Sequence, residues 1–193
     1  MPEAHEKRDA TAARPLAGRR PSRAGAWAAA GVVAAAAVGV AAWAQLAHRG
    51  PTAYGFRVIA AYPHDPDAYT QGLVIAGGRL YEGTGRYGAS SIRRVDLATG
   101  RVEKIHTIDG EYFGEGIAIL DGKLYELTWK SGLAFVYDLD TFNVVQTLRY
   151  PTEGWGLTHD GRNLILSDGS ATLRFLDPAT FKTVREITVR DGD

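Results

Sequence analysis

The chain has 193 residues, which is enough for one domain of ordinary size with an additional leader. Its formal net charge is zero, so the overall charge gives no reason to expect binding to nucleic acid. The absence of cysteine from the sequence excludes disulfides, thiolate nucleophiles and cysteine metal sites. The 23 glycines, with many tyrosines and tryptophans, favour an all-β protein with tight turns.

The beginning of the chain, residues 1–23, is polar and rich in arginine. It offers no apolar face for packing, so we expect a basic, disordered leader in the cytoplasm. Residues 24–47 carry no charged side chain and are mainly alanine, valine and glycine, with Trp27 and Trp43 near the ends. This run is long enough to cross a bilayer of roughly 30 Å as a helix, with a tryptophan at each interface.

The predicted membrane segment allows two interpretations. It is either an uncleaved signal anchor or a signal peptide that is cut after Ala42-Trp43-Ala44, a small-x-small pattern. The preceding arginines predict that the following domain lies outside the cytoplasm, in the periplasm or the cell exterior. It would be held at the inner membrane by an anchor and secreted if the leader is cleaved. Residues 48–60 are interpreted as a linker entering a first strand near residues 56–59.

Short strand-like runs recur in three similar units over the predicted domain, residues 61–193. A glycine turn followed by Leu-Tyr-Glu occurs at residues 78–82 and again at 122–126, with a looser copy at 161–165. The leucines of these copies are 44 and 40 residues apart. A period near 42 residues with about four strands per unit is typical of β-propeller blades.

Each unit is predicted to hold four strands. An inner strand leads through a glycine turn into a second strand, and the third ends at an Asp-x-x-Thr turn. An outer strand follows at residues 102–108, 144–150 or 183–189. Asp and Thr side chains bond nearby backbone amides in tight turns. We therefore interpret the acids of the three turns as structural: Asp96, Asp138 and Asp177.

The predicted domain is shorter than a closed propeller. Residues 62–193 hold about three units, whereas propellers close with roughly four to eight blades. An open ring of blades exposes strand edges. The sequence therefore predicts an incomplete propeller, either a fragment or a truncated gene product.

The start of each inner strand carries a polar or aromatic side chain followed by glycine. Gln71, Glu115 and Trp155 are 44 and 40 residues apart, so the repeat predicts that they meet at one place. Glu115 lies between two glycines, where a ligand can approach the backbone, and a partly desolvated carboxyl group can act as general acid or base. Gln71 offers an amide for orienting a polar substrate. Trp129, Trp155 and Tyr69 offer apolar walls.

The same residues also have a purely structural interpretation. In that interpretation the glycines serve strand geometry, the aromatic rings fill the core and Glu115 is a solvated loop acid. Spacing alone leaves both interpretations open. The five histidines show no metal-ligand spacing, so we expect no metal site.

A set of ordered motifs is more specific than the spacing. They are Tyr-Pro-His-Asp-Pro at 62–66, Tyr-Thr-Gln-Gly-Leu at 69–73, Leu-Tyr-Glu-Gly-Thr-Gly-Arg-Tyr-Gly at 80–88, Tyr-Phe-Gly-Glu-Gly at 112–116, Leu-Thr-Trp at 127–129, Glu-Gly-Trp-Gly-Leu at 153–157 and Ser-Asp-Gly-Ser at 167–170. Together they closely resemble the plant-type glutaminyl cyclases, also found in bacteria, which are glutamine cyclotransferases. The resemblance covers nearly all of residues 62–190.

The resemblance implies a five-bladed β-propeller and a glutaminyl-peptide cyclotransferase, an acyltransferase. The α-amine of an N-terminal glutamine of a peptide or protein would attack its own side-chain amide, releasing ammonia and leaving pyroglutamate. By motif, Glu115 matches the catalytic acid that relays the proton and Gln71 a substrate-contacting residue. Trp129 and Trp155 match pocket tryptophans. Tyr69 stands where the family often has Phe, which keeps an aromatic wall.

The resemblance implies no catalytic metal or cofactor. Some family members carry a structural calcium ion, for which this sequence identifies no ligands. The family's later motifs supply an Asn in Asn-Glu-Leu-Glu, a further Trp and a Lys, and this sequence contains none of them. Two alternatives therefore stay open: a non-catalytic propeller that binds peptides or another ligand, and an inactive, truncated cyclotransferase.

Overall fold

The computed structural model describes residues 53–190. The predicted leader at residues 1–23, the predicted membrane segment at residues 24–47 and the start of the linker lie outside the described residues. Among the residues that the structure describes, no helix is long and apolar enough to cross a membrane. The chain divides into two compact units, Met1–Gly55 and Phe56–Asp193, and the second contains every described strand.

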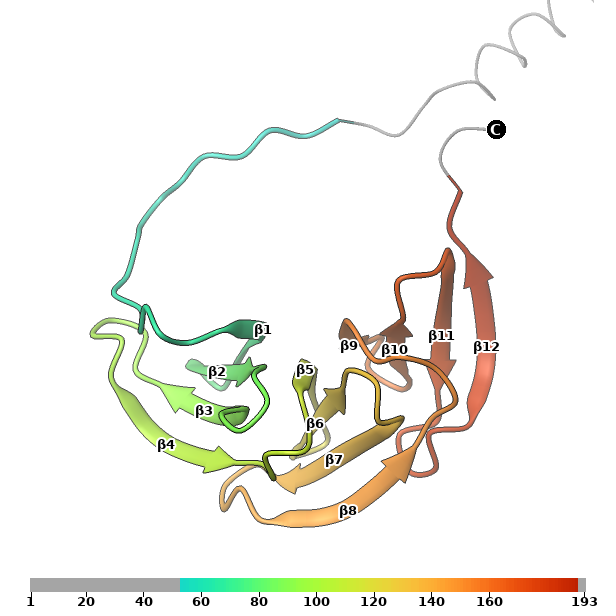
Figure 1. Cartoon of the computed structure of the whole chain (residues 1–193). Helices are drawn as coiled ribbons and strands as arrows, with labels where there is room; N and C mark the ends of the chain where they lie inside the picture. The colour runs from blue at the N-terminus through green and yellow to red at the C-terminus, as the bar shows by residue number, and fades with distance from the viewer. Residues whose placement is uncertain (1–52, 191–193) are drawn as a thin grey trace, which may run out of the picture. The chain divides into compact units, whose positions relative to one another are not determined.

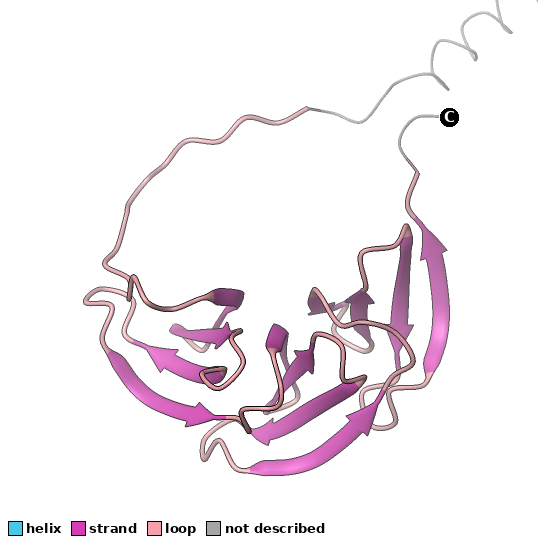
Figure 2. Cartoon of the chain, viewed as in Figure 1, coloured by secondary structure: helices cyan, strands magenta, loops and turns pink. Residues whose placement is uncertain are grey.

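The second unit is all-β, as predicted, and its described residues form three four-stranded antiparallel sheets with the strands in chain order (Figures 1 and 2). The first sheet contains β1 (Thr70–Ala76), β2 (Arg79–Thr84), β3 (Ser91–Val95) and β4 (Val102–Thr107). The second contains β5 (Gly114–Leu120), β6 (Lys123–Thr128), β7 (Leu133–Asp138) and β8 (Val144–Arg149). The third contains β9 (Leu157–His159), β10 (Leu164–Ser167), β11 (Thr172–Leu176) and β12 (Thr183–Thr188). The predicted outer strands are confirmed to within one residue.

The three sheets lie side by side through their inner strands. β1 packs beside β5 and β5 packs beside β9, while β4, β8 and β12 lie outermost (Figure 1). The second sheet therefore has a neighbour on each face, and this explains why every residue of β6 after Lys123 is buried. The outer strands are mostly exposed on both faces in the second and third sheets.

Two apolar cores separate the sheets. One lies between the first and second sheets and includes Ile92 and Ile117. The other lies between the second and third sheets and includes Leu127 and Leu166. Each core is built from the side chains of two sheets, so neither sheet can bury its apolar face alone. The packing of each sheet on its neighbour therefore fixes the positions of the inner strand ends.

The turn after each third strand is held by its aspartate. Asp138 Oδ1 accepts hydrogen bonds from the backbone N–H of Thr141 at 2.8 Å and from its hydroxyl at 2.7 Å. These bonds, the hydroxyl first, hold the pKa of Asp138 below its usual range. The same two bonds occur at Asp96 with Thr99 and at Asp177 with Thr180. The predicted structural role of these acids is confirmed.

The residue after each Asp-x-x-Thr turn has a left-handed backbone. Gly100 has a φ of 70°, whereas Phe142 and Phe181 have φ values of 59° and 55°. Left-handed φ is costly for a large side chain. Both phenylalanine rings are buried, one in each core, and this burial offsets the local strain.

The prediction of a first strand near residues 56–59 is wrong. This segment is not in a strand, and the side chains of Phe56 and Ile59 are 95% and 89% exposed. A strand requires a partner that satisfies its backbone hydrogen bonds. None of the described strands pairs with this segment, so the β-type residues remain an extended, exposed linker.

Candidate active site

Each inner strand has an irregularity at its start or just before it, at the residue that the repeat singles out. The pairing of β1 with β2 shifts register at Gln71, and that of β5 with β6 shifts at Glu115. In the third sheet, the Trp155 N–H donates to the carbonyl of Ser167, while the Ser167 N–H donates to the carbonyl of Gly156. Two residues thus face one partner residue, which is the pattern of a β-bulge. Such bulges redirect a side chain out of the regular alternation of the strand.

The two glycines around Glu115 allow close packing of the backbone. A Cβ atom at Gly116 would lie 2.5 Å from the carbonyl oxygen of Trp155, to which the Gly116 N–H donates at 2.8 Å. A Cβ atom at Gly114 would lie 2.6 Å from Glu126 Oε1. The structural interpretation is therefore correct for these glycines, because their open space is filled by the protein rather than left for a ligand.

The redirected side chains share one cavity. It has a volume of about 490 Å³. Its lining consists of Tyr69, Gln71, Arg86, Phe113, Glu115, Trp129 and Trp155. The structure thus brings together all five site residues predicted from the sequence. The inner strands supply the polar pair and the loops around them supply most of the rings.

Glu115 provides the titratable carboxyl group of this cavity. Partial burial is the main cause that raises its pKa to about 7, and the negative charge of Glu153 acts in the same direction. A hydrogen bond with the Gln71 side chain partly opposes the rise, because it favours the ionised carboxylate. Both protonation states are therefore populated at neutral pH, which suits a group that accepts and then donates a proton.

The aromatic wall contains a residue that the sequence analysis did not select. Phe113 contacts three rings edge-on, with centroids 6.2 Å from Tyr69, 5.4 Å from Tyr87 and 5.6 Å from Trp129. The backbone carbonyl of Phe113 accepts a hydrogen bond from the backbone N–H of Trp129 at 2.9 Å. Phe113 lies two residues before Glu115, as Tyr69 does before Gln71, and this equivalence in the repeat was the available signal.

Glu153 is a second residue that sequence reasoning missed. Its Oε2 atom accepts the indole N–H of Trp129 and that of Trp155, each at 3.0 Å. The carboxylate therefore joins two rings of the cavity wall that come from different loops. The motif at 153–157 begins with Glu153, and the repeat makes it equivalent to Phe113, so a signal for the residue was present. The contact itself depends on how the two loops fold toward each other.

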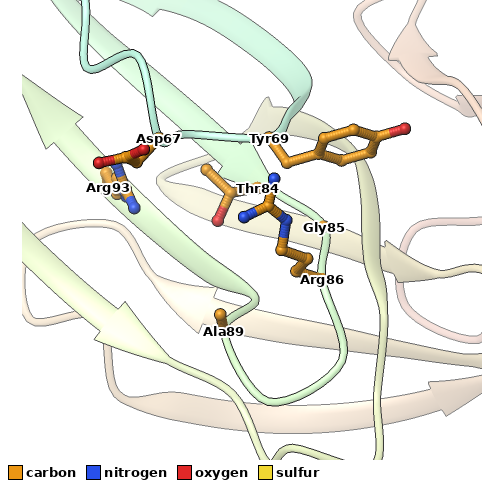
Figure 3. Close-up of a pocket in the computed structure, with 7 residues that line it drawn as sticks. All are labelled: Asp67, Tyr69, Thr84, Gly85, Arg86, Ala89 and Arg93. Atoms are coloured by element: carbon orange, nitrogen blue, oxygen red, sulfur yellow. The ribbon is translucent and has the colours of Figure 1, made fainter.

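A smaller cavity of about 60 Å³ adjoins the site (Figure 3). It shares Tyr69 and Arg86 with the larger cavity. The Arg86 guanidinium carbon lies 5.6 Å from the centroid of the Tyr69 ring. Figure 3 shows the Arg86 side chain reaching back toward Thr84 while the Tyr69 ring extends away from it. Arg86 thus adds a cation to the rim, another residue not selected from the sequence.

A partly buried polar network around Glu82 supports the loop that precedes β1. His64 Nε2 lies 2.8 Å from Glu82 Oε1, and the Thr70 hydroxyl donates to the same oxygen at 2.6 Å. His64 thus fastens its loop to β2, and Thr70, which shares the same Glu82 oxygen, directly precedes Gln71. Among residues 53–190, no three His, Asp or Glu side chains gather in a way that could hold a metal ion.

Comparison with known proteins identifies the family. A family model described as glutamine cyclotransferase matches residues 31–193. The chain belongs to the glutamine cyclotransferase family. A curated relative of this chain, the glutaminyl-peptide cyclotransferase of Arabidopsis thaliana, is 46% identical over 135 residues. The match covers 69% of this chain and 42% of the relative.

Solved structures give the same relationship. The glutaminyl cyclase of Myxococcus xanthus is 35% identical with a TM-score of 0.65, over 69% of this chain and 56% of that chain. The Pan2 WD40 domain of Neurospora crassa is 13% identical with a TM-score of 0.53, over 64% of this chain and 37% of that chain, and shows a likeness of fold alone. This glutamine cyclotransferase chain therefore has a propeller-like fold and spans about half the length of its relatives. The resemblance found in the sequence is confirmed.

Proposed function

We propose that this glutamine cyclotransferase chain forms part of an enzyme that converts the N-terminal glutamine of peptides or proteins to pyroglutamate. The observation that carries the proposal is the placement of Glu115, with a pKa of about 7, in a cavity walled by aromatic rings. The volume of about 490 Å³ lies in the range of small-molecule sites. A non-catalytic binder has no need of a carboxyl group that changes protonation at neutral pH.

The reaction requires one proton to move between two nitrogens. The neutral α-amine attacks the side-chain amide carbon of the same glutamine, and a new carbon–nitrogen bond closes the ring. Glu115, as the carboxylate, accepts a proton from the attacking nitrogen and returns it to the amide nitrogen. The bond to that nitrogen breaks, ammonia leaves, and the carboxylate is regenerated.

The other cavity residues orient the substrate. The Gln71 amide lines the same cavity as Glu115 and can donate to or accept from the substrate amide. The rings of Tyr69, Trp129 and Trp155 enclose the flexible glutamine side chain and favour a ring-like pose. When binding already holds the reacting groups together, little further entropy is lost on ring closure, and this raises the rate considerably.

The proposal includes the finer architecture and the location. The period of the repeats and the coverage of 56% of the Myxococcus chain support a five-bladed propeller of which these three sheets are blades. Residues 24–47 would anchor the chain or export it, so that the cavity lies outside the cytoplasm. Peptides with N-terminal glutamine in that compartment would be the substrates.

Ammonia release from a glutamine-initiated dipeptide tests the function. We expect the full natural protein that contains this sequence to release ammonia and form the pyroglutamyl dipeptide in equal amounts. The matched control is the same dipeptide with an acetylated α-amine, which cannot attack and should release nothing. Absence of ammonia from the first peptide, with binding detected by calorimetry, would instead support the non-catalytic binder.

A further inference from the structure

Two tryptophans of the cavity wall share one hydrogen-bond acceptor. The indole N–H groups of Trp129 and Trp155 both donate to Glu153 Oε2 at 3.0 Å. Trp155 is 49% exposed, so packing alone does not hold its ring. An ionised acceptor gives stronger and more directional bonds than a neutral one, so Glu153 can fix both ring planes together.

The backbone holds Glu153 close to this position. The neighbouring Gly154 N–H donates to the Trp129 carbonyl at 2.8 Å, and the Trp129 N–H donates to the Phe113 carbonyl at 2.9 Å. A Cβ atom at Gly154 would lie 2.8 Å from the carbonyl oxygen of Thr128, so the loop packs directly on the end of β6. The loop that carries Glu153 is thus fixed to the end of β6, directly before Trp129.

In the third repeat unit, a carboxylate stands at the position where the first two units have an aromatic ring. Tyr69, Phe113 and Glu153 lie at equivalent positions, each two residues before the irregularity of its inner strand. Tyr69 contacts Phe113, and Phe113 contacts Trp129. The third unit has Glu153 instead of a third aromatic residue, and the edges of two indoles converge on it.

Several charged and titratable groups lie in or beside the cavity that Glu115 borders. Glu153 contributes to its raised pKa through its negative charge, after the larger effect of burial. Arg86 lines the same cavity, and Lys130 Nζ lies 3.9 Å from the centroid of the Trp129 ring. The negative charge of Glu115 in turn adds to the raised pKa of Tyr150, which is about 12 and is raised mainly by burial. Glu153 is the carboxylate of this set that opposes ionisation of Glu115.

We infer that Glu153 is a positioning residue that holds the indole rings of Trp129 and Trp155 as one wall of the glutamine pocket. The inference rests on the proposed function, because the pocket is taken to hold glutamine. It assigns Glu153 two separable effects. Its hydrogen bonds set the shape of the wall, and its charge adds to the effect of burial on the ionisation of Glu115.

Two variants in the full natural protein separate these effects. Glu153→Ala removes both hydrogen bonds, so the NMR signals of both indole N–H groups should shift, and KM for a glutamine-initiated dipeptide should rise about tenfold with a smaller change in kcat. Glu153→Gln keeps an acceptor oxygen and removes the charge. In this variant the acidic limb of the pH profile of kcat/KM should move to lower pH, because Glu115 then ionises more easily. Trp129→Phe and Trp155→Phe assign the two signals.

Glu103→Gln is the matched control. Glu103 lies on β4, away from the cavity, and pairs with Arg94 of β3, so its change should move neither readout. An unchanged signal for either indole in Glu153→Ala, or an unchanged KM, would overturn the inference. If Glu153→Ala does not fold, Glu153→Gln decides, and an unmoved acidic limb overturns it. If the unmodified protein releases no ammonia, the proposed function fails, yet the indole signals still decide whether Glu153 holds the rings.

Discussion

Glu115 and Glu126 lie on adjacent strands of the second sheet and have pKa values raised to about 7 by burial. Their surroundings differ. Glu115 borders the open cavity beside Gln71, whereas Glu126 is fully buried. Glu126 Oε2 accepts the Tyr137 hydroxyl at 2.6 Å, and its Oε1 has no hydrogen-bond partner within residues 53–190. A raised pKa therefore does not distinguish a reactive carboxyl group from a core one, but access to a cavity does.

The strand geometry explains why Glu115 borders the cavity while Glu126 is buried. The register shift in β5 redirects Glu115 out of the sheet, while Glu126 in β6 follows the regular alternation and points into the protein. Gly114, the neighbour of Glu115, leaves room for the buried carboxyl group, since a Cβ atom there would lie 2.6 Å from Glu126 Oε1. One irregularity in one strand thus divides two chemically similar groups between the cavity and the interior.

The largest expected effect distinguishes the two carboxyl groups by activity. Glu115→Gln removes the proton relay and should lower kcat for ammonia release by about 10²- to 10⁴-fold. Glu126→Gln should keep most of the activity, because its side chain does not reach the cavity. Both variants are assayed with a glutamine-initiated dipeptide after their folding has been checked by circular dichroism. Equal losses in the two variants would break the distinction.

The second prediction concerns stability and pH. Since Glu126 binds its proton more tightly in the folded chain, the folded state holds more protons than the unfolded state between about pH 4.5 and 7. The resulting stability is complete below this window and is lost as the pH rises through it, by about 3 kcal/mol. Urea unfolding at several pH values should show this loss, reduced in Glu126→Gln. An identical slope in both proteins would show that Glu126 ionises normally.

The third prediction tests how closely β5 packs against Glu126 at Gly114. Gly114→Ala places a methyl group against Glu126 Oε1 and, at 2.7 Å, against the carbonyl oxygen of Thr84. Overpacking of this kind should reduce the free energy of unfolding by about 1–3 kcal/mol. The measurement is again urea unfolding. A variant as stable as the parent would mean that β5 is not held as closely as the structure shows.

The smallest effect is expected at a turn acid, which lies neither in the cavity nor in the protein interior. Asp138→Ala removes two hydrogen bonds from the turn after β7 and should lower the free energy of unfolding by about 1 kcal/mol. The kcat for ammonia release should not change. A marked loss of turnover at unchanged stability would contradict the structural role of the turn acids.

Much of the fold follows from the sequence because the repeats are periodic. The copies of the glycine turn and of the Asp-x-x-Thr turn fix the strand boundaries, and their spacing predicts that Gln71, Glu115 and Trp155 share one place. The segment at residues 56–59 misleads, because β-type residues form a strand only when a partner strand is present. Strand propensity alone contains no information about that partner.

The site could be predicted only in part. The repeat and the motifs select Gln71, Glu115 and three aromatic residues. The motif at 153–157 contains Glu153, but neither pattern predicts its role, because that role depends on two loops that bring indole N–H groups to one oxygen. Glu126 is equally unmarked, because the motif that contains it reads as an ordinary strand. Burial and partners, which arise only on folding, determine what each carboxyl group does.

The most direct test follows both carboxyl groups while a ligand binds. Carboxyl carbon signals of Glu115 and Glu126, assigned with their Gln variants, are titrated by NMR with and without the product pyroglutamyl dipeptide. We predict that Glu115 titrates near pH 7 and that the ligand shifts its signal and its pKa, while the signal of Glu126 stays unchanged. A response at Glu126 alone, or at neither group when the ligand is saturating, would contradict the assignment of Glu115 to the substrate cavity.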